Sequence, residues 1–545
     1  MVKHTATPGP RLLPLSLSMA LLCVLAGCGD EAGSEELWAR INVVSPDPAQ
    51  FPDDDPFEFC HYVRACFTAQ DKEDCRTVLW EDHIADIGPL PPNDDMTVCM
   101  ECLPVIDTGG TPIPGEPLSG GCTPPFSHAA GGDVEQLNLF MQKLNTTMPP
   151  VDITGSETAP TATRWGAAVQ VLYDGRVLIA GGAEFKDGCT AWDGVDCLDS
   201  VLDTAEIFDP ATGQFASVGF GSAQVMAHGR AFAAAVELPS GEIAFFGGIG
   251  DDKEALSSVE IFDPFSETFT AGTPMQFARA WHSATVFSDI DDGFVLLAGG
   301  FGTGSDKYEI WNRTNGTVGS GVLKDGDRWR HTATLVTGIT DSRDKIIIAG
   351  GEDDTAVKST YEIFDLSLQT PNFDSEPYDL CLSANEKTSG FPAKAKTMHA
   401  AALVPYQKFL YVVGGFSDIG HDTPTADICV WSVKYEEFTD AAANFKLQTP
   451  RGGLTATSLA DNVILLAGGL TSDSTTAGTY ETIFEYINQN QAKVIDVSPP
   501  APLVSGRWDH EAALLGDGRV LLIGGVQVHL GVYEAVSGAE LYKAQ

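Results

Sequence analysis

The sequence predicts an all-β fold in which seven repeated units of short strands follow a small disulfide-rich module. At 545 residues the chain is too long for one ordinary hydrophobic core, which favours several domains or a repeat architecture. Its 56 glycines and 32 prolines favour many turns and short strands. An apolar run that ends in Gly-Gly also recurs seven times after residue 150, and such a period is typical of repeat folds.

The Gly-Gly doublets mark equivalent places in seven units. They begin at Gly181, Gly247, Gly299, Gly350, Gly414, Gly468 and Gly524. In the third unit the apolar runs 281–287, 294–300 and 308–311 predict three successive strands. Asp-Gly pairs such as Asp174-Gly175 supply the positive φ of a hairpin turn between the first and second strands. The third strand commonly reads Glu, aliphatic, aromatic, Asp, and an aromatic residue then opens a fourth strand.

This order of parts resembles the Kelch repeat over residues 150–545, and the resemblance implies a seven-bladed β-propeller. The fifth and sixth units depart from the pattern, because 427–431 and 483–486 lack the Glu-aromatic-Asp signature. The seventh unit stops after Tyr542 without room for a fourth strand. We therefore expect Val151 to Thr154 to supply that strand and to close the ring.

Residues 1–27 read as a bacterial lipoprotein signal, with Lys3 and Arg11 ahead of an apolar stretch. The stretch ends in Leu-Ala-Gly before Cys28, which resembles a lipobox and predicts lipidation of that thiol. An ordinary secretory signal or a membrane-spanning anchor are the alternatives, although the stretch is short for a span. The acidic segment 28–56 is expected to be a tether. The expected location is the bacterial outer membrane, facing the periplasm or the cell surface.

The remaining cysteines predict disulfide bonds, since exported proteins fold under oxidising conditions. A module at 57–135 holds six of them, at Cys60, Cys66, Cys75, Cys99, Cys102 and Cys122. The sequence does not choose among their fifteen possible pairings. A short helix is expected within 57–69. In the repeats, the even count predicts the pairs Cys189–Cys197 and Cys381–Cys429.

A basic residue occupies one equivalent position in all seven first strands. These residues are Arg164, Arg230, Arg279, Arg328, Lys396, Arg451 and Arg507. Histidine follows three residues later in four units, and tryptophan follows directly in three. These residues are His282, His331, His399, His510, Trp165, Trp329 and Trp508. Side chains repeated in every unit commonly join neighbouring blades. They are alternatively a ligand-binding ring at the mouth of a central channel, where guanidinium groups suit carboxylate or sulfate and indole faces suit sugars.

The formal net charge of −43 argues against nucleic acid or an anionic lipid surface as a partner. Contact with a membrane is expected through the N-terminal lipid only, and the protein is expected to be a monomer. No nucleophile elbow, phosphate loop or zinc-protease motif appears, so we predict no catalytic residue, metal or cofactor. The function expected is a cell-envelope binding scaffold whose propeller face contacts a protein or an acidic glycan. The alternative is a carbohydrate-active enzyme of the galactose-oxidase-like or sugar-mutarotase type, which the Kelch resemblance also permits.

Overall fold

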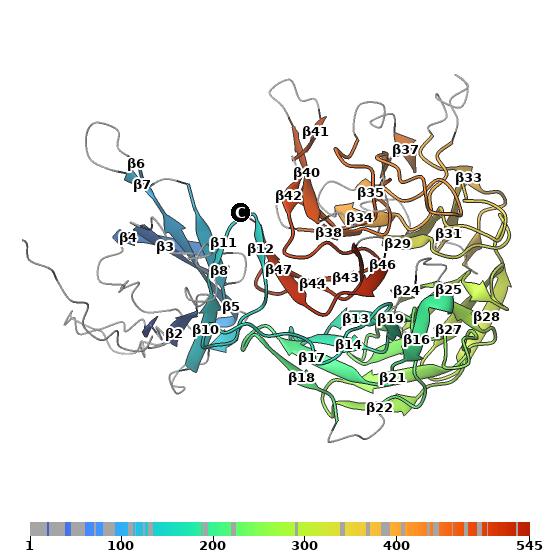
Figure 1. Ribbon diagram of the computed structural model, residues 1–545, viewed down its shortest axis with the longest axis horizontal. Helices are drawn as coiled ribbons and strands as arrows, with labels where there is room; N and C mark the ends of the chain where they lie inside the picture. Colours follow the sequence, from blue (N-terminus) through green and yellow to red (C-terminus); the bar gives the residue numbers. More distant parts are fainter. Residues whose placement is uncertain are drawn as a thin grey trace, which may run out of the picture.

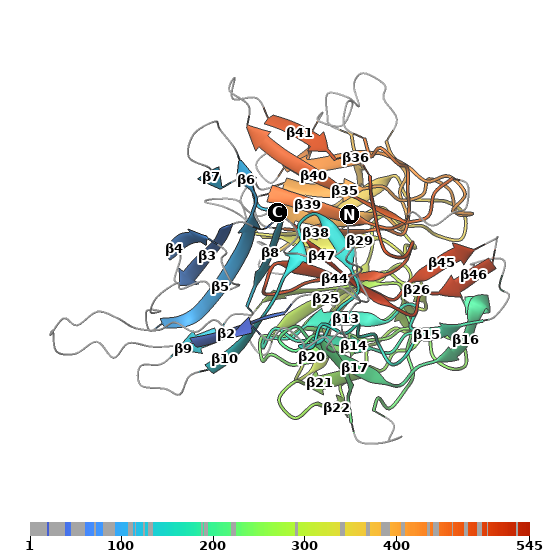
Figure 2. The ribbon, with the colours of Figure 1, turned by 60° about the vertical axis from the view of Figure 1, so that its left-hand side comes forward.

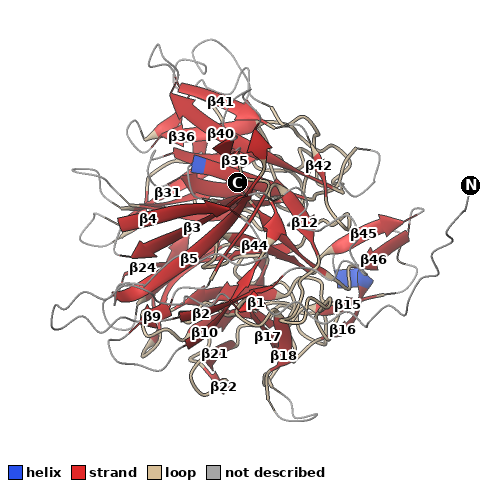
Figure 3. Ribbon diagram, turned by 90° about the vertical axis from the view of Figure 1, so that its left-hand side faces the viewer, coloured by secondary structure: helices blue, strands red, loops and turns tan. Residues whose placement is uncertain are grey.

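A computed structural model of the chain is all-β, with strands joined by turns and loops (Figure 3). From residue 141 to 544 it describes the chain with loop gaps at 187–188, 190–194, 220–224, 289–292, 338–343, 367–370, 383–392, 405–408, 433–435, 440–445, 460–461, 473–477, 488–492, 499 and 530–531. Before residue 141 it describes 19–20, 39–44, 60, 62–69, 72–79, 93–106, 113–114, 116–123, 126–128 and 135–140.

The N-terminal part contains two sheets and a two-stranded ribbon. One sheet joins β1 (Met19–Ala20), β2 (Ala39–Val44) and β10 (Glu135–Phe140). The other joins β3 (Tyr62–Ala69), β4 (Lys72–Leu79), β5 (Asn93–Leu103), β8 (Ser119–Cys122), β9 (Phe126–His128) and β11 (Gln142–Lys143). The ribbon pairs β6 (Val105–Ile106) with β7 (Ile113–Pro114).

Three disulfides hold this N-terminal sheet: Cys60–Cys102, Cys66–Cys75 and Cys99–Cys122. This is one of the fifteen pairings that the sequence left open. The segment expected to be a short helix instead forms β3, which lies between β4 and β5. Two of the three bridges, Cys66–Cys75 and Cys99–Cys122, join cysteines that face each other in paired strands, so sheet formation brings them together.

Seven further sheets follow one plan. The first repeat has β13 (Ala168–Val171), β14 (Val177–Ala180), β17 (Ala205–Asp209) and β18 (Gln214–Ser217). The second has β19 (Ala234–Glu237), β20 (Ile243–Phe246), β21 (Val259–Asp263) and β22 (Thr268–Ala271). The third has β24 (Ser283–Ser288), β25 (Phe294–Ala298), β27 (Lys307–Asn312) and β28 (Gly316–Val322). The fourth has β29 (Thr332–Val336), β30 (Lys345–Ala349), β31 (Thr360–Asp365), β32 (Asn372–Phe373) and β33 (Tyr378–Asp379).

The last three sheets keep the plan with local additions. The fifth repeat has β34 (Ala400–Val404), β35 (Phe409–Val413), β36 (Ile428–Ser432) and β37 (Glu437–Thr439). The sixth has β38 (Thr455–Ser458), β39 (Val463–Ala467), β40 (Thr479–Ile487), β41 (Lys493–Val497) and β42 (Ala501–Pro502). The seventh has β43 (Glu511–Leu514), β44 (Arg519–Ile523), β47 (Ala539–Lys543) and β12 (Thr146–Met148).

Within each sheet, antiparallel strands follow in the order first, second, third, fourth. The second strand is almost wholly buried and apolar, as in Val177–Ala180 and Ile243–Phe246, because neighbouring sheets cover both of its faces. The first strands of the seven sheets contact one another in cyclic order, and the last, β43, contacts the first, β13. The apolar clusters between successive sheets therefore form the core.

The seventh sheet draws its fourth strand from the other end of the repeat region. β12 pairs antiparallel with β47, and the two lie beside the N-terminal sheets (Figure 1). The expectation that Val151 to Thr154 would form this strand is wrong. Val151 instead bridges Glu157, and Asp152 to Gly155 form a turn. The alternation of side chains at 151–154 is typical of a strand, but the strand itself lies a few residues earlier, at Thr146–Met148.

Short additions lie at the Gly-Gly end of some sheets. In the first repeat, β15 (Ala183–Phe185) pairs with β16 (Leu198–Val201), which follows the 3-10 helix η1 (Val195–Cys197). In the seventh, β45 (Val526–His529) pairs with β46 (Val532–Ala535). These two hairpins lie side by side, away from the N-terminal sheets (Figure 2). In the third, β23 (Arg279–Ala280) pairs with β26 (Phe301–Gly302).

The predicted disulfides Cys189–Cys197 and Cys381–Cys429 are confirmed. Apart from Met19 and Ala20, the predicted signal segment and the lipidation site Cys28 lie outside the described residues. No helix in the described parts of the chain is long and apolar enough to cross a membrane.

Candidate functional site

The seven repeated basic residues are buried, with at most 3% of each side chain exposed. Six of them form ion pairs of 2.6–3.0 Å with a glutamate on the third strand of the same sheet. The pairs are Arg164–Glu206, Arg230–Glu260, Arg279–Glu309, Arg328–Glu362, Arg451–Glu481 and Arg507–Glu540. Each arginine also donates to the carbonyl of the first glycine in its own Gly-Gly doublet.

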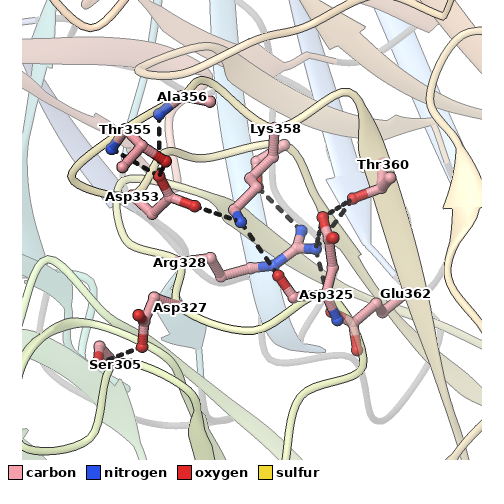
Figure 4. Close-up of polar contacts among 11 residues, drawn as sticks. Ser305, Asp325, Asp327, Arg328, Asp353, Thr355, Ala356, Lys358, Thr360 and Glu362 are labelled. Atoms are coloured by element: carbon pink, nitrogen blue, oxygen red, sulfur yellow. Dashed lines mark hydrogen bonds and ion pairs between the residues drawn. The ribbon is translucent and has the colours of Figure 1, made fainter.

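Each glutamate in turn accepts two backbone N–H groups from the segment just before its arginine. In the fourth repeat, Glu362 accepts from the amides of Lys324 and Asp325 and from Arg328 (Figure 4). The same double acceptance occurs in the other five repeats. We call each such group an arginine clamp, because it fixes the entering chain, the Gly-Gly turn and the third strand together.

The clamps leave no charge for an external anion. Burial lowers the pKa of Arg279 below its ordinary value, although the paired Glu309 opposes that shift. A carboxylate or sulfate ligand would have to displace a buried glutamate that is already hydrogen-bonded to two amides. Six of the seven basic residues thus join strands within their own sheets through a glutamate, and ligand binding by the set stays a prediction.

The fifth repeat replaces both members of the clamp. Cys429 lies opposite Val412, the register that Glu362 has opposite Ile348 in the fourth repeat. Lys396 then donates to the carbonyls of Gly414 and Asp427 at 2.8 and 3.0 Å. Burial lowers the pKa of Lys396 to about 7. The bond from Cys429 to Cys381 thus occupies the position of the missing glutamate.

The four repeated histidines also lie between sheets. Three of them share a hydrogen bond with a hydroxyl on the first strand of the preceding repeat. The pairs are His331–Ser283 at 2.9 Å, His399–Thr332 at 2.9 Å and His510–Thr455 at 3.0 Å. Burial lowers the pKa of all four, so they are neutral at pH 7. Each is at least nine-tenths buried, and their place at a ligand site stays a prediction.

Two of the three tryptophans are equally inaccessible. Trp165 and Trp508 are 1% and 0% exposed and belong to one apolar cluster, while Trp329 is half-buried. The Trp165 indole donates to the Asp509 carboxylate at 2.7 Å. The buried pair cannot offer an open face to a sugar ring, contrary to prediction.

A different set of seven residues forms a ring where the first strands begin. Each lies two residues after the repeated basic residue and has a φ between 47° and 65°. We call this set the inner ring. Its members are Gly166, Phe232, Trp281, Arg330, Met398, Gly453 and Asp509. From Phe232 to Asp509, the amide of each donates to the carbonyl of the preceding member at 2.7–3.3 Å.

Five members of the inner ring are not glycine, although their backbone is left-handed. Such a conformation costs about 1–2 kcal/mol for a residue with a side chain. Sequence reasoning missed this ring because its side chains differ from repeat to repeat and because backbone strain leaves no mark in composition. Alignment on the basic residue was the one signal that could have shown it.

The inner-ring side chains build a mixed aromatic and charged group. Phe232 stacks on Trp281 with centroids 4.6 Å apart, and the Arg330 guanidinium lies 4.7 Å from the Trp281 ring. Arg330 also pairs with Glu352 at 2.6 Å, and Glu352 contacts His421 at 2.9 Å.

The charges in this group shift the two carboxylates in opposite directions. Burial alone would raise the pKa of Glu352, but the bond with His421 and the charge of Arg330 lower it overall. Burial raises the pKa of Asp509, although Trp165, Arg330 and His421 oppose that shift. The lowered pKa keeps Glu352 ionised at pH 7, whereas burial disfavours the charged form of Asp509.

The hairpins β15–β16 and β45–β46 pack beside the inner-ring side chains. The Tyr533 amide donates to the Cys189 carbonyl at 3.3 Å, and Phe185 packs against Trp165 with centroids 5.0 Å apart. The Cys189–Cys197 bond fixes the first hairpin. Tyr533, Phe232 and Trp508 belong to the same apolar cluster, so the hairpin β45–β46 and the inner ring share one core.

A comparison of the chain with protein-family models and with curated proteins finds no match. Within the described residues, no group of three or more His, Cys, Asp or Glu side chains is placed to hold a metal ion. The inner ring is therefore the candidate site from which a function is proposed.

Proposed function

We propose that the chain is a lipid-anchored scaffold of the bacterial cell envelope whose seven sheets form a Kelch-type β-propeller. The cyclic contacts of the first strands support the propeller, as does the pairing of β12 with β47 across the two ends of the repeat region. The six arginine clamps support the Kelch assignment, because they join the Gly-Gly turn to the third-strand glutamate of the repeat.

The scaffold binds its partner at the inner ring. The observation that carries this proposal is that five unlike side chains hold a strained backbone at one repeated position. Positions that serve the fold carry the same residue in most repeats, as the arginines and glutamates do. Strain that persists with varied side chains is typical of functional sites.

The partner is a protein. Trp281, Arg330 and Met398 are partly exposed and belong to the residue types that are enriched in protein interfaces. An acidic glycan is a weaker candidate than the sequence suggested, because the guanidinium groups expected to bind it are held by glutamates. Contact of Glu352 with His421 favours a carbohydrate-active enzyme as the second candidate, since such a pair can act as acid and base.

Immobilised protein exposed to an envelope extract tests the binding site. We expect a captured protein to be lost when Trp281→Ala and Arg330→Ala are combined, and retained when Val318→Ala and Val322→Ala are combined. Val318 and Val322 are half-exposed residues of β28 and serve as the matched control. Equal capture by both variants contradicts the proposal, and turnover of a sugar panel that depends on His421 supports the enzyme instead.

The anchor has its own test. Cys28→Ser should move the protein from the membrane fraction to the soluble fraction and abolish labelling with palmitate. Wild-type protein that incorporates no palmitate contradicts the anchor, whatever the inner ring binds.

A further inference from the structure

A second feature recurs at the hairpin tips, at the opposite end of the sheets from the inner ring. The turn between the first and second strands reads Asp-Gly-Arg in two repeats, and its arginine reaches the third-to-fourth-strand turn of the next repeat. Arg176 bonds Asp174 at 2.7 Å and the Pro264 carbonyl at 3.3 Å. Arg519 likewise bonds Asp517 at 2.7 Å and the Pro210 carbonyl at 3.4 Å. We call each arrangement a tip junction.

The N-terminal part of the chain covers the junction around Arg519. The Phe140 ring lies 5.0 Å from the Arg519 guanidinium and forms a cluster with Met148 and Val151. Arg519 is only 5% exposed in consequence, and Asp517 only 1%. The N-terminal part of the same chain therefore already packs on this tip junction.

No described part of the chain covers the neighbouring junction around Arg176. Here Arg176 and Asp174 are 26% and 29% exposed. Two aromatic side chains border them, with Tyr173 63% exposed and Phe265 89% exposed.

The covered junction has small residues at the same two places. Gly516 precedes Asp517 as Tyr173 precedes Asp174, and Ala211 follows Pro210 as Phe265 follows Pro264. The large apolar residues thus occur at the junction that the chain leaves open. A scattered exposed hydrophobic residue would be ordinary, whereas these two lie on turns that Arg176 joins through Asp174 and the Pro264 carbonyl.

We propose that Tyr173 and Phe265 form a docking surface for a basic segment of another protein. Acidic residues lie on the same turns: Asp174 follows Tyr173, Asp263 and Glu267 flank Phe265, and Glu242 follows Gly241, which lies next to the Tyr173 ring. The two nearby arginines are neutralised, since Arg176 pairs with Asp174 and Glu267 and Arg313 pairs with Glu242. Four carboxylates and two arginines still leave two negative charges in excess, so lysine or arginine from a partner can lie over the aromatic faces next to that excess charge.

The negative charge of the chain favours a basic segment as the partner over a second copy of the chain and over an anionic membrane. A second copy of the chain would bring another net charge of −43 against the first, and an anionic membrane would be repelled in the same way. The surface is independent of the inner ring, because the tips and the ring lie at opposite ends of the first strands. Either site can therefore fail without the other.

Binding of a synthetic decapeptide of alternating arginine and leucine tests the proposal. We expect Tyr173→Ser combined with Phe265→Ser to weaken binding by about tenfold or more relative to wild type. The control, Ile153→Ser with Val504→Ser, changes two other exposed apolar residues and should bind as wild type does. Hydrogen exchange should slow at 173–176 and 263–267 when the peptide is present, and all melting temperatures should agree because the replaced side chains are exposed.

Three results would overturn the proposal. One is equal affinity of the Tyr173/Phe265 variant and the wild type for the arginine peptide. Another is equal binding of the matched glutamate and leucine peptide. The third is wild-type binding to phosphatidylcholine vesicles that the double variant loses, which would assign the aromatic pair to a membrane.

Discussion

His282 shows how a single substitution between repeats leaves a buried group without a partner. Neither of its ring nitrogens has a hydrogen-bond partner among the described residues, although the side chain is only 8% exposed. The equivalent histidines bond a serine or threonine of the preceding repeat, but the residue facing His282 by that equivalence is Ala234. The missing hydroxyl explains the orphaned ring, and a buried polar group without a partner destabilises a fold.

Ala234→Ser should therefore stabilise the protein, by about 0.5–1.5 kcal/mol, because it supplies the absent hydroxyl. Chemical denaturation of wild type and variant measures the difference. Ala168→Ser is the matched control at the preceding interface, where Ala233 replaces the histidine. It should destabilise by about 1–3 kcal/mol by burying an unpaired hydroxyl. Equal effects of the two changes would contradict this account of His282.

The buried histidines also predict acid lability. Burial, and then the charge of Lys396, lower the pKa of His399 to about 3, against about 6.5 in an unfolded chain. Between those two values the unfolded chain binds a proton that the folded protein excludes, so stability falls as the pH falls from about 6.5 to about 3. Urea midpoints across this range should fall, and His399→Gln should make the fall less steep. A slope unchanged by His399→Gln would show that this residue does not titrate as described.

At the level of elements, the clamps explain why the sequence predicted some strands better than others. The third strands of the first four repeats and of the seventh were recognised by a glutamate followed by an aliphatic and an aromatic residue, and that glutamate is the clamp carboxylate. The sixth repeat keeps its glutamate as Glu481, two residues before the run that was taken as the strand. The fifth repeat has no glutamate to find, because Cys429 takes its register. In both repeats the pairing of the strands sets the position of the third strand, and no local sequence pattern shows that pairing.

The substitution in the fifth repeat predicts that a clamp can replace the disulfide. Removing the bond with Cys381→Ala and Cys429→Ala should cost about 2–5 kcal/mol. A variant with Cys381→Ala, Cys429→Glu and Lys396→Arg restores the residue types of the other six repeats and should recover at least half of that loss. Unfolding free energies of the three proteins provide the test. If the restored clamp is no more stable than the double alanine variant, Cys429 does not stand in for the glutamate.

At the scale of the whole molecule, the sequence predicted the all-β class and the two disulfides of the repeats, because both follow from residues repeated or counted along the chain. The fourth strand of the seventh sheet was placed at the wrong segment, since only the pairing of β12 with β47 distinguishes it. The candidate site is proposed at other residues than those the sequence predicted. Repetition of one residue type drew attention to Arg164 and its equivalents, whereas recognition is proposed at a repeated position whose residue type varies, as at Trp281 and Met398.

Two rings of equivalent positions are thus distinguished: the clamps join strands within the sheets, and the inner ring is proposed to serve binding. The most direct measurement is the unfolding free energy of single variants from each ring. Arg→Met at each of the six clamps should cost about 3–5 kcal/mol, because it leaves a buried glutamate uncompensated. Met398→Gly should cost no more than about 1 kcal/mol, because glycine relieves the left-handed backbone. Losses of equal size at Met398 and at the clamps would contradict the division of roles.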